Sequence, residues 1–257
     1  MTDFPATYGS WAVIAGGSDG VGAAFARGLA ARGMNIVLVA RRAPVLEDCA
    51  TALEKDYGVR TRTLSLDLST EEAIGELEHA TADLDIGIFV YNAGSDSRTV
   101  EFLDRTLDEH RALVHRNCVS VLEAAYRFGG PMVTRGRGAL VLVTSGAAWA
   151  GGRNLASYGA SKAFDLILAE GLWAEWRERG VHVLGLVLGA TDTPSLRRTL
   201  DIGDRVLADP HDVAEQALEH LADGPTWIHG SENPTGGSPF GALDRRSAVL
   251  AMSTPRH

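Results

Sequence analysis

The chain has 257 residues, of which 45% are hydrophobic and 22% are charged, as in an ordinary soluble globular protein. A formal net charge of −9 argues against nucleic acid or an acidic membrane surface as a partner. Two cysteines, Cys49 and Cys118, are too few for a disulfide framework, which favours a reducing cytoplasm. No histidine or cysteine spacing matches a zinc site, and no uncharged run is long enough to span a membrane. We therefore expect a cytoplasmic protein with no metal site.

Short apolar runs alternate with helix-like segments along the chain. The predicted strands are Trp11–Ala15, Asn35–Val39, Thr61–Leu66, Ile86–Tyr91, Ala139–Thr144 and Val181–Val187, with Thr226–His229 as a seventh candidate. The predicted helices are Val21–Arg32, Val45–Asp56, Thr70–Ala82, Leu107–Phe128, Ser157–Arg179 and Pro210–Leu221. Almost wholly apolar strands that alternate with helices are typical of a parallel sheet covered on both faces. The sequence therefore predicts one α/β domain over residues 1–257, a Rossmann-type doubly wound parallel sheet.

A glycine-spaced turn connects the first predicted strand to the first predicted helix. Glycines let the backbone approach a pyrophosphate closely, and a helix N-terminus presents amide groups to it. A glycine triplet alone is more often a plain tight turn, but the strand–turn–helix setting here favours a dinucleotide site. The predicted cofactor contacts in this turn are Gly16, Ser18, Asp19, Gly20, Val21 and Gly22.

The second predicted strand ends in Arg41 and Arg42, where an enzyme that prefers NAD would carry an acidic residue. Guanidinium groups bind a 2′-phosphate that a carboxylate would repel. A solvated basic pair after a strand is the alternative interpretation. We predict NADP(H) as the preferred cofactor, with NAD(H) possible.

Two further segments carry candidate binding residues. Asp67, followed by Leu68, would bond the adenine amino group or would simply cap a turn. Asn92, Ala93 and Gly94 end the fourth predicted strand, at the edge where such sheets bind ligands, although a plain turn uses the same residues.

Asn117 lies inside a predicted helix, where asparagine is unfavourable. Its position predicts a local distortion of that helix, which would free a backbone carbonyl for a water near Lys162.

Ser145, Tyr158 and Lys162 form the predicted catalytic group. Residues four apart share a helix face, so the Lys162 ammonium would lie beside the Tyr158 phenol and favour its ionised form. The Ser145 hydroxyl, at the end of the fifth predicted strand, would donate to the same substrate oxygen. Lysine is scarce in this chain, because Lys162 and Lys55 are the only lysines among 24 basic residues. This group predicts nicotinamide-dependent hydride transfer with Tyr158 as the acid/base.

These motifs resemble the classical short-chain dehydrogenase/reductase family over essentially the whole chain. The matching residues are Gly16, Gly20, Gly22, Asn92, Ala93, Gly94, Asn117, Ser145, Tyr158, Lys162, Gly189 and Thr193. The segments Tyr8–Val13 and Arg32–Leu38 are similar to the branch that contains the type 3 and type 12 17β-hydroxysteroid dehydrogenases and 3-oxoacyl-CoA reductases. The membrane-anchoring segment of that branch is not expected here.

The resemblance implies a role for each matching residue. Tyr158 would be the acid/base, Lys162 would hold the nicotinamide ribose, and Ser145 would orient the carbonyl. Asn117 would support a proton-relay water, and Thr193, with Gly189 and Thr191 nearby, would bind the carboxamide end of the cofactor. Three departures bear on loop order and affinity, namely Ala15 for Thr, Tyr91 for Asn and Leu188 for Pro.

The substrate side of the site is predicted to be apolar. The candidate substrate residues are Ser145, Ala147, Trp149, Leu155, Tyr158 and Leu196. They favour a bulky apolar ketone or alcohol, with a 3-oxoacyl thioester as the alternative. Residues of about 10–145 would form the cofactor half and about 145–257 the catalytic and substrate half, with a mobile lid at about 190–207.

Two other functions are alternatives for this sequence, and the sequence also predicts an oligomer. A nucleotide-sugar epimerase or dehydratase would carry more chain after Thr193 for its substrate domain. A dinucleotide-sensing regulator would be expected to lack Ser145, Tyr158 or Lys162. Apolar residues in excess of one stripe on the two long predicted helices, including Leu113 and Val121, predict a homodimer or homotetramer.

Overall fold

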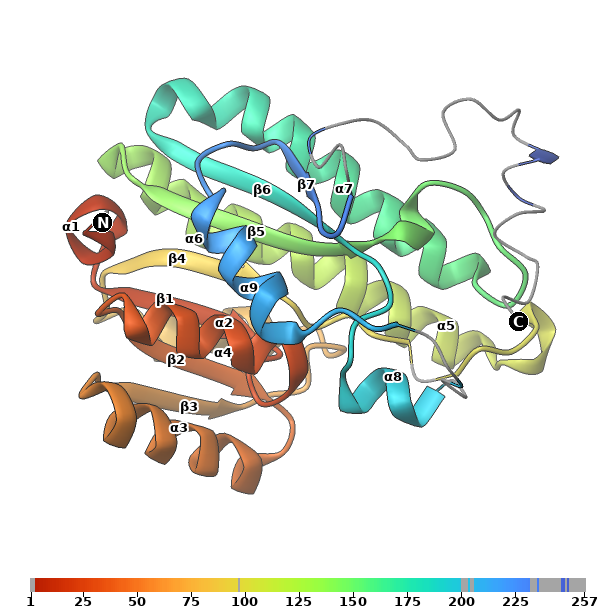
Figure 1. The fold of residues 1–257 in the computed structure, drawn as a ribbon, viewed down its shortest axis with the longest axis horizontal. Helices are drawn as coiled ribbons and strands as arrows, with labels where there is room; N and C mark the ends of the chain where they lie inside the picture. Colours follow the sequence, from red (N-terminus) through yellow and green to blue (C-terminus); the bar gives the residue numbers. More distant parts are fainter. Residues whose placement is uncertain are drawn as a thin grey trace.

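A parallel sheet of seven strands forms the centre of the part of the chain that the structure describes (Figure 1). In this computed structural model the described residues are 3–96, 98–199, 203, 206–231, 235, 246–247 and 249. The strands are β1 Trp11–Ala15, β2 Asn35–Ala40, β3 Thr61–Ser65, β4 Ile86–Tyr91, β5 Gly138–Ser145, β6 Val181–Leu188 and β7 Thr226–Ile228. Their order is β3-β2-β1-β4-β5-β6-β7, with every pair parallel. The predicted doubly wound sheet is confirmed, with its seventh strand.

Helices cover both faces of the sheet because side chains alternate along each strand. Ala12 and Ile14 of β1 pack with α2 Gly20–Ala31, α3 Ala43–Tyr57 and α9 Pro210–Glu219. Trp11, Val13 and Ala15 pack on the opposite face with α4 Ala73–Ala80, α6 Ser120–Arg135 and α7 Ala156–Trp176. In Figure 1, α2 and α9 cross in front of the strands. β1 is buried along its whole length, as its uniformly apolar sequence predicts.

The predicted helix over 107–128 is a composite element. It consists of α5 Leu107–Val114, a π-helical turn over His115–Val119 and α6, which continues to Arg135. The distortion predicted at Asn117 is therefore confirmed. The short helices α1 Phe4–Tyr8 and α8 Pro194–Thr199 were not predicted from the sequence.

The strand order changes direction at β1, which lies between β2 and β4. A doubly wound sheet opens a crevice at the carboxyl ends of the strands beside such a switch point. The glycine turn after β1 and the Asn92–Gly94 segment after β4 both lie there. Part of the predicted lid is described, as α8 and a bridge between Thr191 and Ala208, whereas residues 200–202 and 204–205 lie outside the described residues.

None of the described helices combines the length and the apolar content needed to cross a bilayer.

The glycine turn leaves no room for a side chain at its third glycine. A Cβ on Gly22 would lie 2.0 Å from the Gly16 carbonyl oxygen and 2.6 Å from Asn92 Nδ2. We expect Gly22→Ala to lower the free energy of unfolding by about 1–3 kcal/mol, because the backbone of the turn must move. Gly75 in α4 has no atom within 4 Å of its Cβ position, and it is the matched control. Gly75→Ala should raise the free energy of unfolding by about 0.5–1 kcal/mol. Urea denaturation measures both values, and equal effects would contradict the tight turn.

Candidate active site

The turn after β1 is fastened to the end of β4. Gly16 and Gly20 have φ of 81° and 51°, in the region that favours glycine. Asn92 Nδ2 donates to the Gly16 carbonyl oxygen at 3.1 Å. A Cβ on Gly16 would lie only 2.9 Å from the Ala93 nitrogen. Two predicted segments that lie far apart in the sequence thus form one edge of the crevice, with glycine where the backbones approach each other.

The N-terminus of α2 points its amide groups at the same edge. Asp19 is the N-cap residue, but its side chain makes no capping hydrogen bond. Its carboxylate instead pairs with Arg42, with Nη2 and Oδ2 at 3.1 Å. The amides at Gly20, Val21 and Gly22 therefore stay available to an anion, which fits the pyrophosphate of a dinucleotide. Neighbouring Ser18 accepts a hydrogen bond from Cys49 through its main-chain oxygen.

Arg41 is the exposed cation at the end of β2. Within the described part of the chain its guanidinium has no ion-pair partner, in contrast to that of Arg42. Its main-chain oxygen accepts from Ser65 Oγ at 3.1 Å, which fixes the backbone at this point. Arg41 therefore fits the phosphate-binding role predicted for it, and Arg42 fits that role only if it leaves Asp19.

Asp67 follows β3 beside these cations. Its Oδ1 accepts from Ser69 through the main-chain nitrogen at 3.0 Å and through Oγ at 2.7 Å, so the turn-capping alternative is realised at this oxygen. Burial by itself would raise the pKa of Asp67, but the Ser69 hydrogen bonds and the charges of Arg41 and Arg116 hold it below its ordinary value. The carboxylate keeps a second acceptor oxygen. Leu68 is buried, and its main-chain oxygen accepts from Ser120 Oγ.

The predicted catalytic residues lie where the end of β5 meets α7. Thr144 Oγ1 donates to the Lys162 main-chain oxygen at 2.6 Å, and a Cβ on Gly159 would lie 3.0 Å from the Ala147 carbonyl oxygen. Ser145 Oγ accepts from the Ala147 nitrogen at 3.2 Å, which leaves its hydroxyl proton free to donate. Tyr158 and Lys162 lie one turn apart on the same helix.

Lys162 is held from two sides. Its Nζ donates to the Val143 carbonyl oxygen and to Asp165 Oδ2, both at 2.9 Å. Only 5% of the Lys162 side chain and 2% of the Asp165 side chain are exposed. Burial alone would lower the pKa of Lys162, but the charge and the hydrogen bond of the Asp165 carboxylate oppose this, and its pKa is raised. Sequence analysis predicted Lys162 and missed Asp165, although a spacing of three on one helix was a signal.

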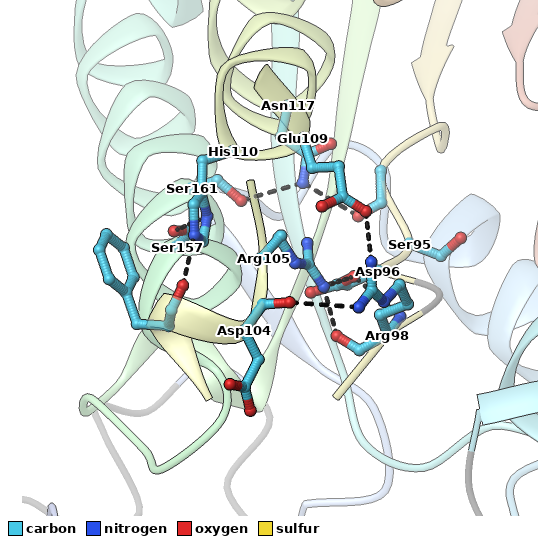
Figure 2. A network of polar contacts seen from close by, with 12 residues as sticks. Ser95, Asp96, Arg98, Asp104, Arg105, Glu109, His110, Asn117, Ser157 and Ser161 are labelled. Atoms are coloured by element: carbon cyan, nitrogen blue, oxygen red, sulfur yellow. Dashed lines mark hydrogen bonds and ion pairs between the residues drawn. The ribbon is translucent and has the colours of Figure 1, made fainter. Parts of the chain in front are cut away.

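Asn117 joins the π-helical turn to two other parts of the site (Figure 2). It is fully buried, and its Nδ2 donates to the Gly94 carbonyl oxygen at 3.1 Å and to Ser161 Oγ at 2.9 Å. Its Oδ1 accepts from Arg116 Nε at 3.2 Å. Tyr91 donates through its hydroxyl to the Arg116 main-chain oxygen at 2.6 Å. The departure from the family pattern at Tyr91 thus supports the turn that carries Asn117.

A small pocket beside Tyr158 has a more polar wall than the sequence predicted. Leu155 lines it together with Asp96, Arg105 and His110. Arg105 Nη2 lies 2.7 Å from Asp96 Oδ1, and both side chains are nearly buried.

These three residues belong to a polar network in the segment after β4 and at the start of α5 (Figure 2). Arg105 also donates to the Arg98 main-chain oxygen, and Arg98 pairs with Glu109. His110 bonds Ser157 Oγ at 2.9 Å. Arg105 and His110 were not predicted from the sequence, although charged residues after β4 were a signal, since that edge binds ligands.

The other predicted substrate residues do not gather around this pocket. Ala147 is buried and its main chain faces Gly159, while Trp149 and Leu196 lie outside the pocket lining. Leu196 donates its main-chain nitrogen to Thr193 Oγ1 at 3.1 Å and so belongs to the start of α8.

The segment after β6 lies against the glycine turn. Thr193 Cγ2 lies 2.8 Å from the position that a Cβ on Gly20 would take. Thr191 is buried, and its Oγ1 donates to the Gly189 carbonyl oxygen at 3.3 Å. The predicted carboxamide residues thus lie at the same crevice as the predicted pyrophosphate residues. In the described residues no group of three or more His, Cys, Asp and Glu side chains is arranged to hold a metal ion.

The chain is similar in sequence to a family of known proteins and to individual members of it. The profile of the short chain dehydrogenase family matches residues 10–201. A 7beta-hydroxysteroid dehydrogenase of Mediterraneibacter gnavus is 31% identical over 88% of this chain and 88% of its own length. A very-long-chain 3-oxoacyl-CoA reductase of Macaca fascicularis is 31% identical over 75% of this chain and 64% of its own length.

Solved structures are similar over nearly the whole chain. A 7beta-hydroxysteroid dehydrogenase superposes with a TM-score of 0.91 and 30% identity, covering 98% of this chain and 99% of that one. A short-chain dehydrogenase from Sphingobium yanoikuyae in complex with NADPH has a TM-score of 0.82 and 27% identity, covering 96% and 97%. A bulky-bulky ketone specific alcohol dehydrogenase from Comamonas testosteroni has a TM-score of 0.79 and 25% identity, covering 96% of each chain.

Proposed function

The chain belongs to the short chain dehydrogenase family, and from this premise we propose that it is an NADP(H)-dependent oxidoreductase that interconverts a bulky apolar ketone and its secondary alcohol. Membership of the family makes it an NAD(P)-dependent enzyme that acts on CH–OH and C=O groups. The observation that carries the proposal is that the end of β5, which carries Ser145, packs against the part of α7 that carries Tyr158 and Lys162, at the edge that the glycine turn also reaches. A dinucleotide-sensing regulator would not need this group.

The residues of the site divide the work of the reaction. NADP(H), when bound, supplies or accepts the hydride. The free hydroxyl proton of Ser145 orients the carbonyl oxygen, and Tyr158 donates a proton to that oxygen. Proton donation by a positioned acid is worth about 10²–10⁴ in rate, and orientation supplies much of the rest. Lys162 holds the nicotinamide ribose, and Asn117 ties the site together from the π-helical turn, in the place predicted for a proton relay.

The preference for NADP(H) over NAD(H) rests on charge. Arg41 is exposed at the end of β2 and Arg42 lies beside it, with no acidic residue at the end of this strand. A relative of known structure is in complex with NADPH, which supports the same choice.

The substrate class rests on the relatives, and the small pocket beside Tyr158 adds only the character of one wall. Leu155 and Val100 give it apolar wall, and the charges of Asp96 and Arg105 neutralise each other. Similar proteins act on a hydroxysteroid and on bulky-bulky ketones, which favours a multi-ring substrate. A 3-oxoacyl thioester is the second candidate, because a very-long-chain 3-oxoacyl-CoA reductase is also similar.

Assembly as a cytoplasmic homodimer or homotetramer, without nucleic acid or membrane, completes the proposal. Leu113 and Val121 are buried in the fold, so they do not provide the apolar excess predicted for them. Leu122, Tyr126 and Ile167 on α6 and α7 are instead 51%, 82% and 65% exposed, and they support an interface between copies. The division into a cofactor half and a substrate half, with a lid at about 190–207, belongs to the same proposal.

NADPH oxidation against ketones graded from acetone-sized to steroid-sized tests the function. Apolar burial contributes about 25 cal/mol per Å², so multi-ring ketones should exceed small ones by about tenfold or more in kcat/KM. Equal efficiency on small polar ketones would refute the apolar substrate, and turnover of 3-oxoacyl thioesters alone would favour the second candidate.

Tyr158→Phe, assayed with the best ketone, should abolish turnover and leave NADPH affinity within a few-fold, because it removes only the proton-donating hydroxyl. Lys162→Ala should reduce both. Tyr57→Phe, on the outer helix α3, is the control and should behave as the wild type. Substantial turnover by Tyr158→Phe would remove this tyrosine from the mechanism.

Arg41→Ala should weaken NADPH binding with little change for NADH. A charge-assisted hydrogen bond to phosphate is worth about 1.5–3 kcal/mol, or roughly 10- to 150-fold in affinity. Fluorescence titration with both cofactors measures this, with Arg111→Ala on the exposed side of α5 as the control. Tighter binding of NADH than NADPH by the wild type would overturn the preference.

A further inference from the structure

A buried carboxylate stands directly behind the proposed catalytic lysine. Tyr158, Lys162 and Asp165 succeed one another at spacings of four and three along α7, so they form one row on a face of the helix. The ammonium lies in the middle of the row, bonded to Asp165 Oδ2 at 2.9 Å. Asp165 Oδ1 is buried without a hydrogen-bond partner in the described structure. An ion pair of this kind is costly to bury, and apolar side chains in its place often leave a fold equally stable. Its presence therefore points to the site rather than to the fold.

Asp165 is the carboxylate that faces Lys162 from the described elements packed around it. Burial raises the pKa of Asp165 above its ordinary value, and the charge and hydrogen bond of Lys162 oppose that shift and favour the ionised form. Cys118 in the π-helical turn has a pKa that burial raises to about 11, and burial also raises the pKa of Tyr91 on β4, so both stay neutral at ordinary pH. Arg116 adds a second cation nearby. On α5, His110 is bonded to Ser157. The strands β5 and β6 contribute no acidic residue, and His182 of β6 bonds Tyr8.

We propose that Asp165 is a positioning residue of this site, the fixed counterion that holds the Lys162 ammonium in place and keeps Tyr158 available as a protonated acid. Lys162 has three N–H donors, of which Asp165 and the Val143 carbonyl oxygen take two. One donor is left for the ribose and the phenol. The row thus carries a carboxylate, an ammonium and a neutral phenol, with no net charge.

The charges of this row determine the direction in which the pH of proton loss moves when Asp165 is neutralised. Without the carboxylate, the ammonium and the neutral phenol together carry one buried positive charge. Loss of one proton removes that charge, whether it leaves from the phenol or from the ammonium, and the two products are one macroscopic state. The protonated pair that ketone reduction requires must therefore be lost at a lower pH when Asp165 is neutralised.

Reduction of the best multi-ring ketone by NADPH between about pH 6 and 10 gives the kinetic test. Asp165→Asn is nearly isosteric, and it should move the alkaline limb of kcat/KM to lower pH by about one unit or more. Asp165→Glu, which restores the charge, should return the limb toward the wild-type position. Glu170→Gln is the matched control, because this carboxylate lies on the same helix but bonds Thr226 Oγ1.

Two outcomes of the kinetic test would overturn the inference. A uniform loss of activity at every pH, with the alkaline limb unmoved, would make Asp165 a structural residue only. An equal shift in Glu170→Gln would make the effect one of general charge.

Because the chain has only two lysines, Lys162 is also visible without any substrate. The protein without added cofactor or ketone, labelled with ¹³C and ¹⁵N in lysine side chains, should give two lysine signals, which Lys55→Arg assigns. The pH midpoint of the Lys162 signal should fall in Asp165→Asn relative to the wild type. An unchanged midpoint would refute the counterion role. The inference rests on the proposed function for its kinetic readout alone, so a protein that reduces no ketone would still pass or fail this titration.

Discussion

The burial of one ammonium group governs the arrangement of the site. A lysine side chain that is 5% exposed must find acceptors inside the protein, and Val143 at the end of β5 and Asp165 on α7 provide them. The hydrogen bond from Thr144 Oγ1 to the Lys162 carbonyl oxygen joins the same strand and helix a second time. The contact between β5 and α7 is thus partly polar, which fixes one rotation of the helix against the sheet. That rotation decides where Tyr158 of α7 lies relative to Ser145 of β5.

Arginine side chains hold the segment after β4 in place through ion pairs and hydrogen bonds. The described residues between β4 and the short turn at Phe102–Asp104 have no regular secondary structure, yet Arg98 and Arg105 connect this segment to Asp96, Glu109 and its own backbone. Such pairs contribute little to stability when they are exposed. Arg105 and Asp96 are nearly buried, and so they hold the wall of the pocket in one conformation. A loop wall fixed by ion pairs can remain free of net charge while it is built from charged residues.

The sequence predicted the sheet, its strands and the main residues of the site, because these depend on local patterns. Uniformly apolar runs mark the strands, and the spacing from Tyr158 to Lys162 is fixed by the geometry of one helix. The pairing of Asp19 with Arg42 was not predictable, since it depends on how the loops after β1 and β2 approach each other in space. The part of Arg105 and His110 in the polar wall was missed for the same reason. The placing of Trp149 and Leu196 on the substrate side stays a prediction, because position after a strand indicates an edge of the sheet but not the direction of a side chain.

The π-helical turn at His115–Val119 has a consequence for how this gene can change. A π turn holds one residue more than the α-helical turn it replaces, and each residue in an α-helix advances the rotation by about 100°. Because the wider π turn absorbs the rotation of its extra residue, loss of any single codon in this stretch would let the helix become regular and leave α5 and α6 in nearly the same relative rotation. The residues of the turn itself would shift, and Asn117 would leave Gly94 and Ser161. Single-residue deletions, tolerated in many surface helices, should therefore be absent from this segment in any lineage that keeps the site.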